Sequence, residues 1–550
     1  MSKKVMRTIA VSLFAAICIG SVFAAAAVEE PAALPEGSLL PWTGEEVIFQ
    51  GFGADLGITE DPTMPVVQEY RKTTGNVRID WSVVPWNDFD TKVNLYLQSG
   101  DLPDILWARD PVAKSHLYGP LGFFLDWEMY KDYMPNLQTA IEDFPYLNNL
   151  LTQKGERFTL TDYGQTDRHA YGWAYNPAIL EQAGISAPPD TVEELLQQMK
   201  RVKAVLPETD GYLSYWGINY IIAAFSRAMG VKATEGGNPG IDYDTDLEKW
   251  IYGPTMDPDY KNLIAYLNEA YEAGVFNLDA LSSDIRNEKT AELIGRGNHA
   301  FQYMSHWAYT QASVGGGPDT PMRWMKTPSY QGKTYYWMAF SHDSVSSFGF
   351  LANAKVKNPE LLASYVDNII SYEISELFEW GLEGVTFKRL PGGGHEFLPE
   401  IQADMTKATD FGVSNFWDPR FVHYVPLKEL WFTKEFPNKD DPGRHALCND
   451  LKMLYGGVYT PVYRPYRNAR PVMSVEQNDE IGKIMAPLTT FVQEQQLKFI
   501  TGAREMSEWD GFIAQVNQRH DIDTVLRYYG EGVQIPIEGG RWADLDPHCQ

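Results

Sequence analysis

Trp107 and Asp110 are residues whose types and spacing indicate a binding chemistry. They lie three positions apart, at the end of an apolar stretch and just after it. An indole ring offers a flat apolar face for stacking, and a carboxylate accepts hydrogen bonds from hydroxyl groups. A sugar presents both apolar C–H faces and a rim of hydroxyls, so the pair is a candidate sugar contact. Structural alternatives stay open, because Trp107 could be a core residue and Asp110 a helix N-cap.

Motifs of common catalytic sites are absent from the sequence. It contains no Gly-x-Ser-x-Gly nucleophile elbow, no His-Glu-x-x-His zinc motif and no complete phosphate loop ending in Gly-Lys-Ser/Thr. We therefore expect a protein that binds without catalysis and needs no cofactor. A glycosidase needs only two well-placed carboxylates, and 73 acidic residues leave room for such a pair. A secreted polysaccharide-cleaving enzyme is the alternative hypothesis.

Residues 242–248 carry alternating carboxylates that resemble a calcium-binding loop. Leu247 stands where the turn glycine of such a loop belongs, and Gly253 stands where the bidentate glutamate belongs. The segment is better interpreted as a solvated acidic turn, and no bound metal is expected.

The N-terminus is typical of a secretory signal peptide over residues 1–26. Three cations precede an apolar run at 9–23, and small residues follow at 24–27. The run is shorter than the roughly 20 residues that span a bilayer. Cys18 follows Ile17 rather than a small residue, which argues against a lipid anchor. We expect export to the periplasm or outside the cell, with cleavage after one of Ala24 to Ala27.

Charge and length restrict the class of protein further. The net charge is −27, and it becomes −30 when the three signal-peptide cations are removed, because 46 − 3 leaves 43 cations against 73 anions. Such an acidic chain is repelled by phosphate backbones, so nucleic acid is not an expected partner. The length exceeds what one hydrophobic core usually serves, which predicts at least two lobes. Cys448 and Cys549 could form one disulfide, although nothing in the sequence requires it.

The pattern after a flexible leader at residues 27–44 alternates between strand and helix. Strands are expected at 47–50, 77–83 and 101–107, and helices at 66–73 and 88–99, with Gly100 as a C-terminal cap. This order predicts an open α/β sheet, which binds ligands at the carboxyl ends of its strands.

A further helix begins at Thr191, which is the expected N-cap, with Glu194 completing a capping box. Its apolar stripe consists of Val192, Leu195, Leu196, Met199 and Val202. Four more helices are expected at 260–273, 359–380, 476–502 and 506–529.

Five segments in order resemble the extracellular solute-binding proteins of ATP-binding-cassette (ABC) importers, which include the maltodextrin-binding proteins, and in particular their longer oligosaccharide-binding branch. The segments are 102–110, 171–195, 297–307, 381–387 and 498–512. The resemblance implies a two-lobed, periplasmic-binding-protein-like α/β fold of type II, with an open sheet and flanking helices in each lobe and a hinge between them. It implies a monomer that captures a sugar or oligosaccharide by lobe closure and delivers it to ABC permease subunits in the membrane.

The resemblance also implies how the lobes are divided along the chain. The first lobe is expected to comprise residues 45–170 and 341–395, and the second lobe residues 171–340 and 396–550, including the C-terminal helices. Some long-branch relatives carry a calcium loop after the first helix of the second lobe, but residues 207–211 are too short and lack most of its ligands.

Four more candidate ligand-binding residues follow from these positions. His169 and Trp173 lie beside the expected crossover between the lobes, where the Trp could equally pack between the hinge segments. His306 and Trp307 end the segment that delivers an aromatic ring to the cleft in relatives. Trp107 precedes the crossover and Trp307 follows it, so we expect the two rings to face one another from opposite walls. His169 stands where maltodextrin binders have an acidic contact, which puts maltodextrin itself in doubt.

Overall fold

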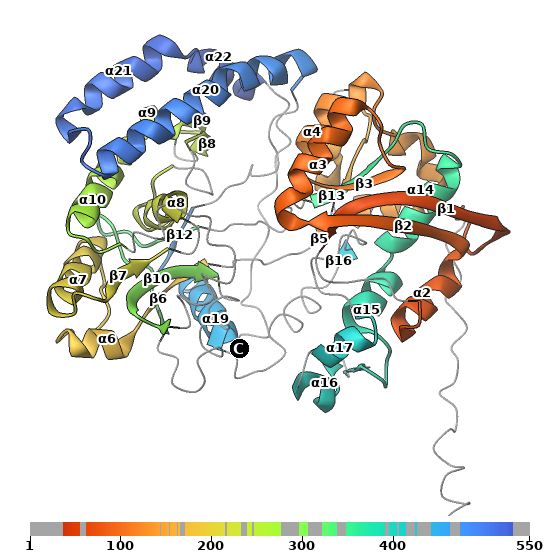
Figure 1. Cartoon of the computed structure of the whole chain (residues 1–550), viewed down its shortest axis with the longest axis horizontal. Coiled ribbons are helices and arrows are strands. Elements are labelled where there is room, and N and C mark those ends of the chain that lie inside the picture. The colour runs from red at the N-terminus through yellow and green to blue at the C-terminus, as the bar shows by residue number, and fades with distance from the viewer. Residues whose placement is uncertain are drawn as a thin grey trace, which may run out of the picture.

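The structure is a computed structural model. It describes residues 37–531 except 56–61, 144, 153, 162, 165–170, 215–216, 233–238, 245–246, 277–295, 306–321, 338–347, 391–394, 404–405, 414–423, 426–441 and 463–472. Figure 1 shows two bodies side by side, each with a sheet and flanking helices. The predicted two-lobed α/β fold is therefore confirmed.

The first lobe is built on a five-stranded sheet in the order β2-β1-β3-β13-β4. Its strands are β1 (Trp42–Asp55), β2 (Gly75–Pro85), β3 (Ile105–Arg109), β13 (Phe348–Ala352) and β4 (Leu160–Thr161). The first three strands are parallel, and β13 runs antiparallel to both β3 and β4. The helices between the parallel strands are α2 (Pro65–Thr74) and α3 (Trp86–Ser99), and α4 (Pro111–Tyr118) follows β3. The expected order of strand, helix, strand, helix and strand is confirmed.

Local signals in the sequence explain these boundaries. Gly100 ends α3 with φ 70°, a left-handed conformation that glycine adopts without steric cost, and its amide donates to the Tyr96 carbonyl. Leu40 is buried and β1 already begins at Trp42, so the ordered chain starts before residue 44, where we expected the leader to end.

The second lobe is built on a four-stranded sheet in the order β11-β6-β10-β7. The strands are β11 (Arg323–Met325), β6 (Tyr171–Tyr175), β10 (His299–Ser305) and β7 (Asp210–Leu213). Its helices include α7 (Val192–Val205), α8 (Gly217–Met229), α10 (Tyr260–Glu272), α20 (Val475–Ile500), α21 (Trp509–Arg519) and α22 (Ile522–Glu531).

Helix α7 begins as the sequence predicts. The Thr191 hydroxyl accepts from the Glu194 amide, and all five residues of the apolar stripe are buried. The Glu194 carboxylate accepts from the amide of Asp190 rather than that of Thr191, so the capping box reaches one residue further back.

Two expected long helices are each divided in two. The segment 359–380 forms α14 (Pro359–Ile370) and α15 (Tyr372–Trp380), because Ser371 is extended and its hydroxyl caps the second helix. The segment 506–529 forms α21 and α22, which are separated by extended His520.

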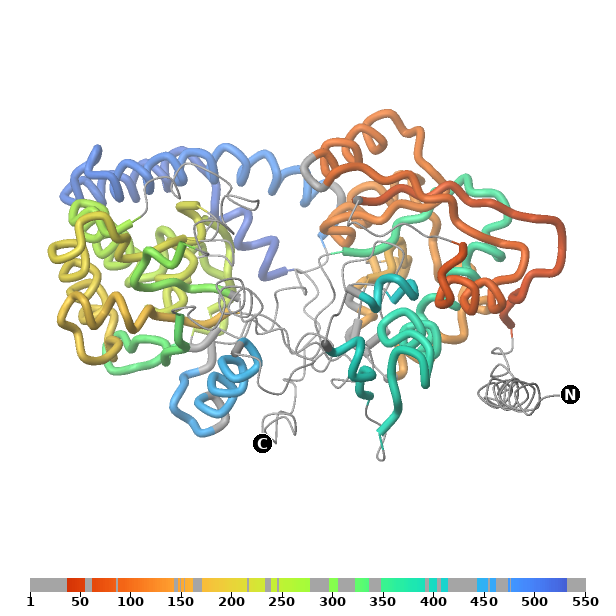
Figure 2. Tube along the Cα trace, turned by 60° about the horizontal axis from the view of Figure 1, so that its bottom comes forward, coloured from red at the N-terminus to blue at the C-terminus, as the bar shows by residue number. Residues whose placement is uncertain are grey.

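Each lobe has its own hydrophobic core. The first cluster contains residues of β1, β3, β13 and α14, and the second contains residues of β6, β10, α7, α8 and α10. Phe397, Ile401 and Val413 belong to the first cluster, past residue 395 where the sequence analysis places the return to the second lobe. Helix α20 packs on α10 and also contacts α4 of the first lobe, and Figure 2 shows it extending from the second lobe toward the first.

Two other features bear on expectations from the sequence. Strands β8 (Ile241–Asp244) and β9 (Lys249–Tyr252) pair antiparallel, and the Asp244 carboxylate accepts from the Leu247 amide. Cys448, in α19 (Pro442–Tyr455), is disulfide-bonded, and the other cysteines of the chain lie outside the described residues.

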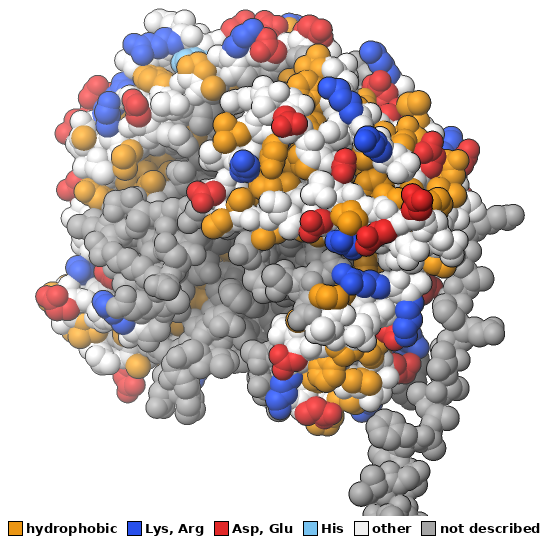
Figure 3. Space-filling model, turned by 45° about the vertical axis from the view of Figure 1, so that its right-hand side comes forward, with side chains coloured by type: hydrophobic (Ala, Val, Ile, Leu, Met, Phe, Trp, Pro, Cys, Tyr) orange, Lys and Arg blue, Asp and Glu red, His pale blue; other side chains and the backbone are white. Residues whose placement is uncertain are grey.

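Charged groups of both signs share the surface. On the face shown in Figure 3, Lys and Arg side chains are scattered among Asp and Glu. The described residues of this face form no extended basic surface of the kind that binds a phosphate backbone.

Candidate functional site

The carboxyl ends of the parallel strands β1, β2 and β3 of the first lobe, and of β10 of the second, lie toward the middle of the molecule. Helices α3 and α4, which follow β2 and β3, lie on the side of the first lobe nearer to the second, and the β10 arrow points toward the first lobe (Figure 1). In the second lobe, Ser305 at the end of β10 pairs with Tyr171 at the start of β6. Open α/β sheets bind ligands at such edges, so the two edges together form the candidate site.

The edge of the first lobe presents an exposed carboxylate beside a neutralised cation. The Arg109 guanidinium lies 3.2 Å from the Asp90 carboxylate. Lys114 donates from its ammonium to the Arg109 carbonyl, and burial lowers the pKa of this lysine. Asp110 is exposed. The charge of Arg109 is therefore already balanced by Asp90.

Asp110 has an unusual backbone conformation. Its φ of 47° and ψ of 51° are left-handed, which costs an ordinary residue about 1–2 kcal/mol and costs aspartate somewhat less. It occupies the N-cap position of α4, as the structural alternative expected, but its side chain makes no capping hydrogen bond. A strained residue with an exposed carboxylate at a strand end is a candidate ligand contact.

Trp107 lies in the core of the first lobe. Its side chain is 2% exposed, and its ring stacks on Phe348 with centroids 4.8 Å apart and lies 5.2 Å from the ring of Phe89. Residues 105–108 are all buried because β3 is a central strand between β1 and β13. This placement corresponds to the core alternative for Trp107 and differs from the exposed ring that a stacking role requires.

Trp173 is likewise a core residue, in the second lobe. It is 1% exposed and contacts the rings of Tyr212, Phe225 and Tyr303. The ring therefore packs between its own sheet and α8, which differs from the expected ligand contact or position between the hinge segments.

The edge of the second lobe carries a tyrosine cluster that the sequence analysis did not identify as a unit. The rings of Tyr171 and Tyr303 stack with centroids 5.8 Å apart, and the Tyr171 hydroxyl lies 3.1 Å from that of Tyr220. The guanidinium of Arg227 lies over both rings of the stack. The sequence feature that could have indicated this cluster is a single arginine, Arg227, within the mostly apolar run 221–229.

Comparison with known proteins identifies the family. The family model of the bacterial extracellular solute-binding proteins matches residues 57–374, which is more than half of the 550-residue chain. The chain belongs to this family. It is also similar to the fructooligosaccharide ABC transporter substrate-binding protein FusA of Streptococcus pneumoniae, with 22% identity over 490 residues that cover 81% of this chain and 82% of the relative.

Several solved structures of similar fold align with most of the chain of this solute-binding protein. Alginate-binding protein AlgQ2 has a TM-score of 0.66 at 15% identity, over 89% of this chain and 99% of that chain. An HMO-binding solute-binding protein from Bifidobacterium longum infantis has a TM-score of 0.64 at 16% identity, over 88% and 98%. FusA in complex with kestose has a TM-score of 0.62 at 18% identity, over 88% and 99%. At these identities the likeness establishes the fold alone.

Three sequence-predicted site residues of this solute-binding protein lie outside the described residues: His169, His306 and Trp307. In the sequence, His169 precedes Tyr171 by two positions, and Trp307 follows Ser305 by two. The expectation that Trp107 and Trp307 face one another stays a prediction.

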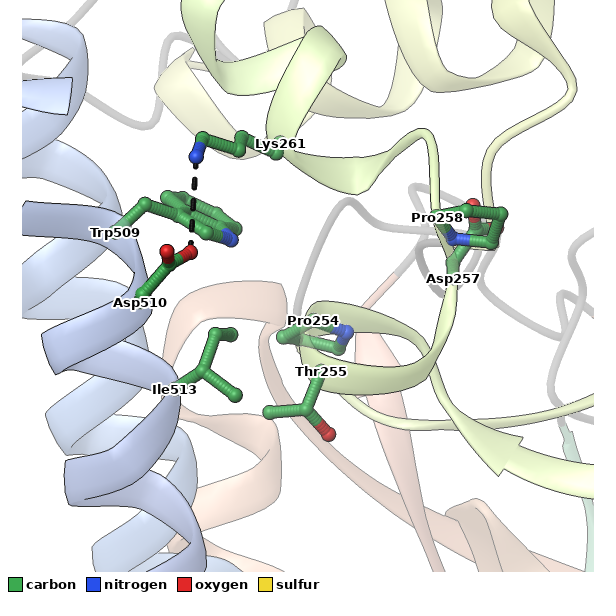
Figure 4. A pocket seen from close by; sticks show the side chains of 8 residues that line it. All are labelled: Pro254, Thr255, Asp257, Pro258, Lys261, Trp509, Asp510 and Ile513. Atoms are coloured by element: carbon green, nitrogen blue, oxygen red, sulfur yellow. Dashed lines mark ion pairs between the residues drawn. The ribbon is translucent and has the colours of Figure 1, made fainter. Parts of the chain in front are cut away.

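A pocket of about 400 Å³ lies on the second lobe between α9 (Gly253–Met256), the start of α10 and α21 (Figure 4). It is lined by Pro254, Thr255, Asp257, Pro258, Lys261, Trp509, Asp510 and Ile513. The Asp257 carboxylate already accepts from the backbone amides of Lys232 and Asp259. Lys261 and Asp510 lie 3.7 Å apart in a solvent-exposed pair. The Asp257 carboxylate is already hydrogen-bonded and the ion pair is exposed to solvent. This pocket is therefore a weaker candidate ligand-binding site than the strand edges.

Within the described part of the solute-binding protein, no helix is long and apolar enough to cross a membrane. The same residues contain no group of three or more His, Cys, Asp or Glu side chains that could hold a metal ion.

Proposed function

We propose that this protein captures a sugar or oligosaccharide outside the cytoplasm and delivers it to the membrane subunits of an ABC importer. Membership of the solute-binding family is the observation that carries the proposal. FusA, named as a fructooligosaccharide transporter component, and the HMO-binding and alginate-binding proteins of similar fold support a carbohydrate ligand.

The mechanism is lobe closure without chemistry. A ligand that contacts both strand edges stabilises the closed form, and it shifts the equilibrium by its difference in affinity for the closed and open forms. Separate cores allow each lobe to move as a body around the segments that connect them. The membrane subunits would then recognise the closed form.

The electrostatics of the first edge favour a neutral sugar. Arg109 is paired with Asp90, and the Lys114 ammonium interacts with both Asp90 and Asp110, so the described groups of this edge leave no excess positive charge. The exposed Asp110 carboxylate can accept hydrogen bonds from hydroxyls, and these groups hold no excess cation to pair with the carboxylates of an acidic sugar. We therefore rank neutral oligosaccharides first, monosaccharides next, and acidic oligosaccharides and peptides last.

Thermal unfolding of the purified mature protein with a ligand panel tests the function. The panel contains kestose, a neutral milk oligosaccharide, an alginate oligosaccharide, glucose and a short peptide. A ligand at 100 times its Kd is expected to add about 2.7 kcal/mol of stability. The bound sugar should be recovered unchanged. Stabilisation by none of the sugars would contradict the proposal, and release of new reducing ends would favour the glycosidase alternative.

Asp110→Asn is expected to weaken sugar binding by roughly 1–3 kcal/mol, because ligand hydroxyls would lose a charged acceptor in a closed site. Its stability without ligand should change by less than about 1 kcal/mol, since asparagine also tolerates the left-handed conformation. Titration calorimetry and urea unfolding measure the two effects. Asp80→Asn, at an exposed position within β2, is the control and should bind like wild type. Unchanged affinity in Asp110→Asn would remove this residue from the site.

Export is part of the same proposal. We infer that the signal peptide is removed after one of Ala24 to Ala27 and that Cys18 is not lipidated. N-terminal sequencing of the secreted protein checks the cleavage, and incorporation of a labelled fatty acid would contradict the absence of an anchor.

A further inference from the structure

Arg227 is a buried cation beside the ligand-facing edge of the second lobe. The residue lies on α8 and is 6% exposed. Its guanidinium lies 5.2 Å from the ring centroid of Tyr171 and 5.5 Å from that of Tyr303, and it donates a hydrogen bond of 3.2 Å to the Tyr303 hydroxyl. Removing a cation from water is costly, so the contacts with the two rings and the hydroxyl help to stabilise the buried guanidinium.

Helix α8 holds the stacked tyrosines at two points. Tyr220 and Arg227 are seven residues apart, which places them on one face of the helix two turns from each other. The first contacts the hydroxyl of Tyr171, and the second contacts its ring. Helix α8 therefore holds half-buried Tyr171 through both its hydroxyl group and its ring.

The same tyrosines lie where the edge of the sheet is formed. Tyr171 is the first residue of β6 and pairs with Ser305, the last residue of β10, while Tyr303 pairs with Trp173. A displacement of the stack would therefore move the ends of both strands at the candidate site.

We propose that Arg227 is a positioning residue for ligand binding. It holds the half-buried ring of Tyr171, stacked on the buried ring of Tyr303, in the orientation that the edge of the second lobe presents to a ligand, without contacting the ligand itself. This inference rests on the proposed sugar-binding function.

The test compares two substitutions of Arg227 in the full mature protein. Arg227→Met keeps most of the side-chain length and the apolar packing but removes the charge. Arg227→Lys keeps the charge but lacks the planar guanidinium group. Calorimetry with kestose and a neutral milk oligosaccharide is expected to show about tenfold weaker binding for Arg227→Met, with Arg227→Lys between it and wild type. Urea unfolding without ligand reports stability separately.

Arg504→Met is the matched control. Arg504 also has a largely buried side chain in the second lobe, and its guanidinium lies 4.9 Å over Phe499, away from the strand edge. This variant is expected to lose stability like Arg227→Met and to bind with wild-type affinity. A merely structural role for Arg227 would make the two variants behave alike in binding.

Tyr303→Phe supplies a milder test if Arg227→Met fails to fold. It removes one hydroxyl and should weaken binding about three- to fivefold, and in the Arg227→Met background it should add almost nothing, because both changes break the same contact. Binding by Arg227→Met within twofold of wild type would overturn the inference. If it does not fold, wild-type affinity in Tyr303→Phe would overturn it. Absence of sugar binding by the wild-type protein would instead contradict the proposed function, and this inference with it.

Discussion

Trp107→Ala is expected to lower the free energy of unfolding of the ligand-free protein by about 3–5 kcal/mol, as truncation of a buried tryptophan does elsewhere. The ring is 2% exposed and packed against Phe348 and Phe89, so alanine would leave a cavity between β3, β13 and α3. Urea unfolding followed by circular dichroism measures the loss. Trp107→Phe, which retains an aromatic ring in the stack, should lose considerably less.

Trp81→Ala is the control for this prediction. Trp81 lies on β2, is half-buried and stacks on Phe350 with centroids 6.0 Å apart. Because it buries less area, its truncation should cost clearly less than that of Trp107. If Trp107→Ala unfolded within about 1 kcal/mol of wild type and bound sugar far more weakly, the ring would be a ligand contact and its placement in the core would be wrong.

The second large effect is expected at Glu376, the centre of an ionic network in the first lobe. Its carboxylate contacts Arg389 at 2.6 Å and His395 at 2.5 Å, and it accepts from the Tyr372 hydroxyl. Arg389 also pairs with Glu383, and His395 is buried against Trp380. This network joins α15 to the hairpin of β14 (Phe387–Arg389) and β15 (His395–Phe397).

The pKa of Glu376 determines how the network responds to pH. Burial alone would raise this pKa, but hydrogen bonds from His395 and Arg389 together outweigh burial and lower the pKa to about 2, from 4.5. A lowered folded-state pKa contributes stability above the unfolded pKa, here roughly 3 kcal/mol at neutral pH. That contribution is lost as the pH falls from about 4.5 to about 2.

Glu376→Gln is therefore expected to be less stable than wild type by roughly 3 kcal/mol at pH 7 and by about 1 kcal/mol at pH 3. Urea unfolding across this pH range measures the convergence. Glu396→Gln is the control on the same hairpin, because its 2.8 Å pair with Lys388 is solvent-exposed and should contribute little. A constant difference between wild type and Glu376→Gln at pH 7 and pH 3 would contradict the role of ionisation.

Part of the candidate site could be predicted from residue types alone. Asp110 is exposed at a strand end as expected, because a carboxylate after an apolar strand has no core to join. The environment of Trp107 could not be predicted, since its ring is covered by Phe348, which lies more than 200 residues later in the chain. The contact of Arg227 with the tyrosines likewise joins three elements that no local pattern relates.

The sequence by itself determined the local elements and the family. Residues a few positions apart determine the N-cap and apolar stripe of α7 and the alternation of strands and helices from β1 to β3. Side-chain periodicity and capping hydrogen bonds act over this short range. The tertiary structure alone decided which apolar and aromatic residues are buried in a core and which lie exposed or half-buried at the strand edges. Trp107 and Trp173 resemble ligand rings in sequence, but rings from other elements cover them: Phe89 and Phe348 pack on the first, and Tyr212 and Phe225 pack on the second. Burial depends on such distant partners, and the order of residues along the chain does not record them.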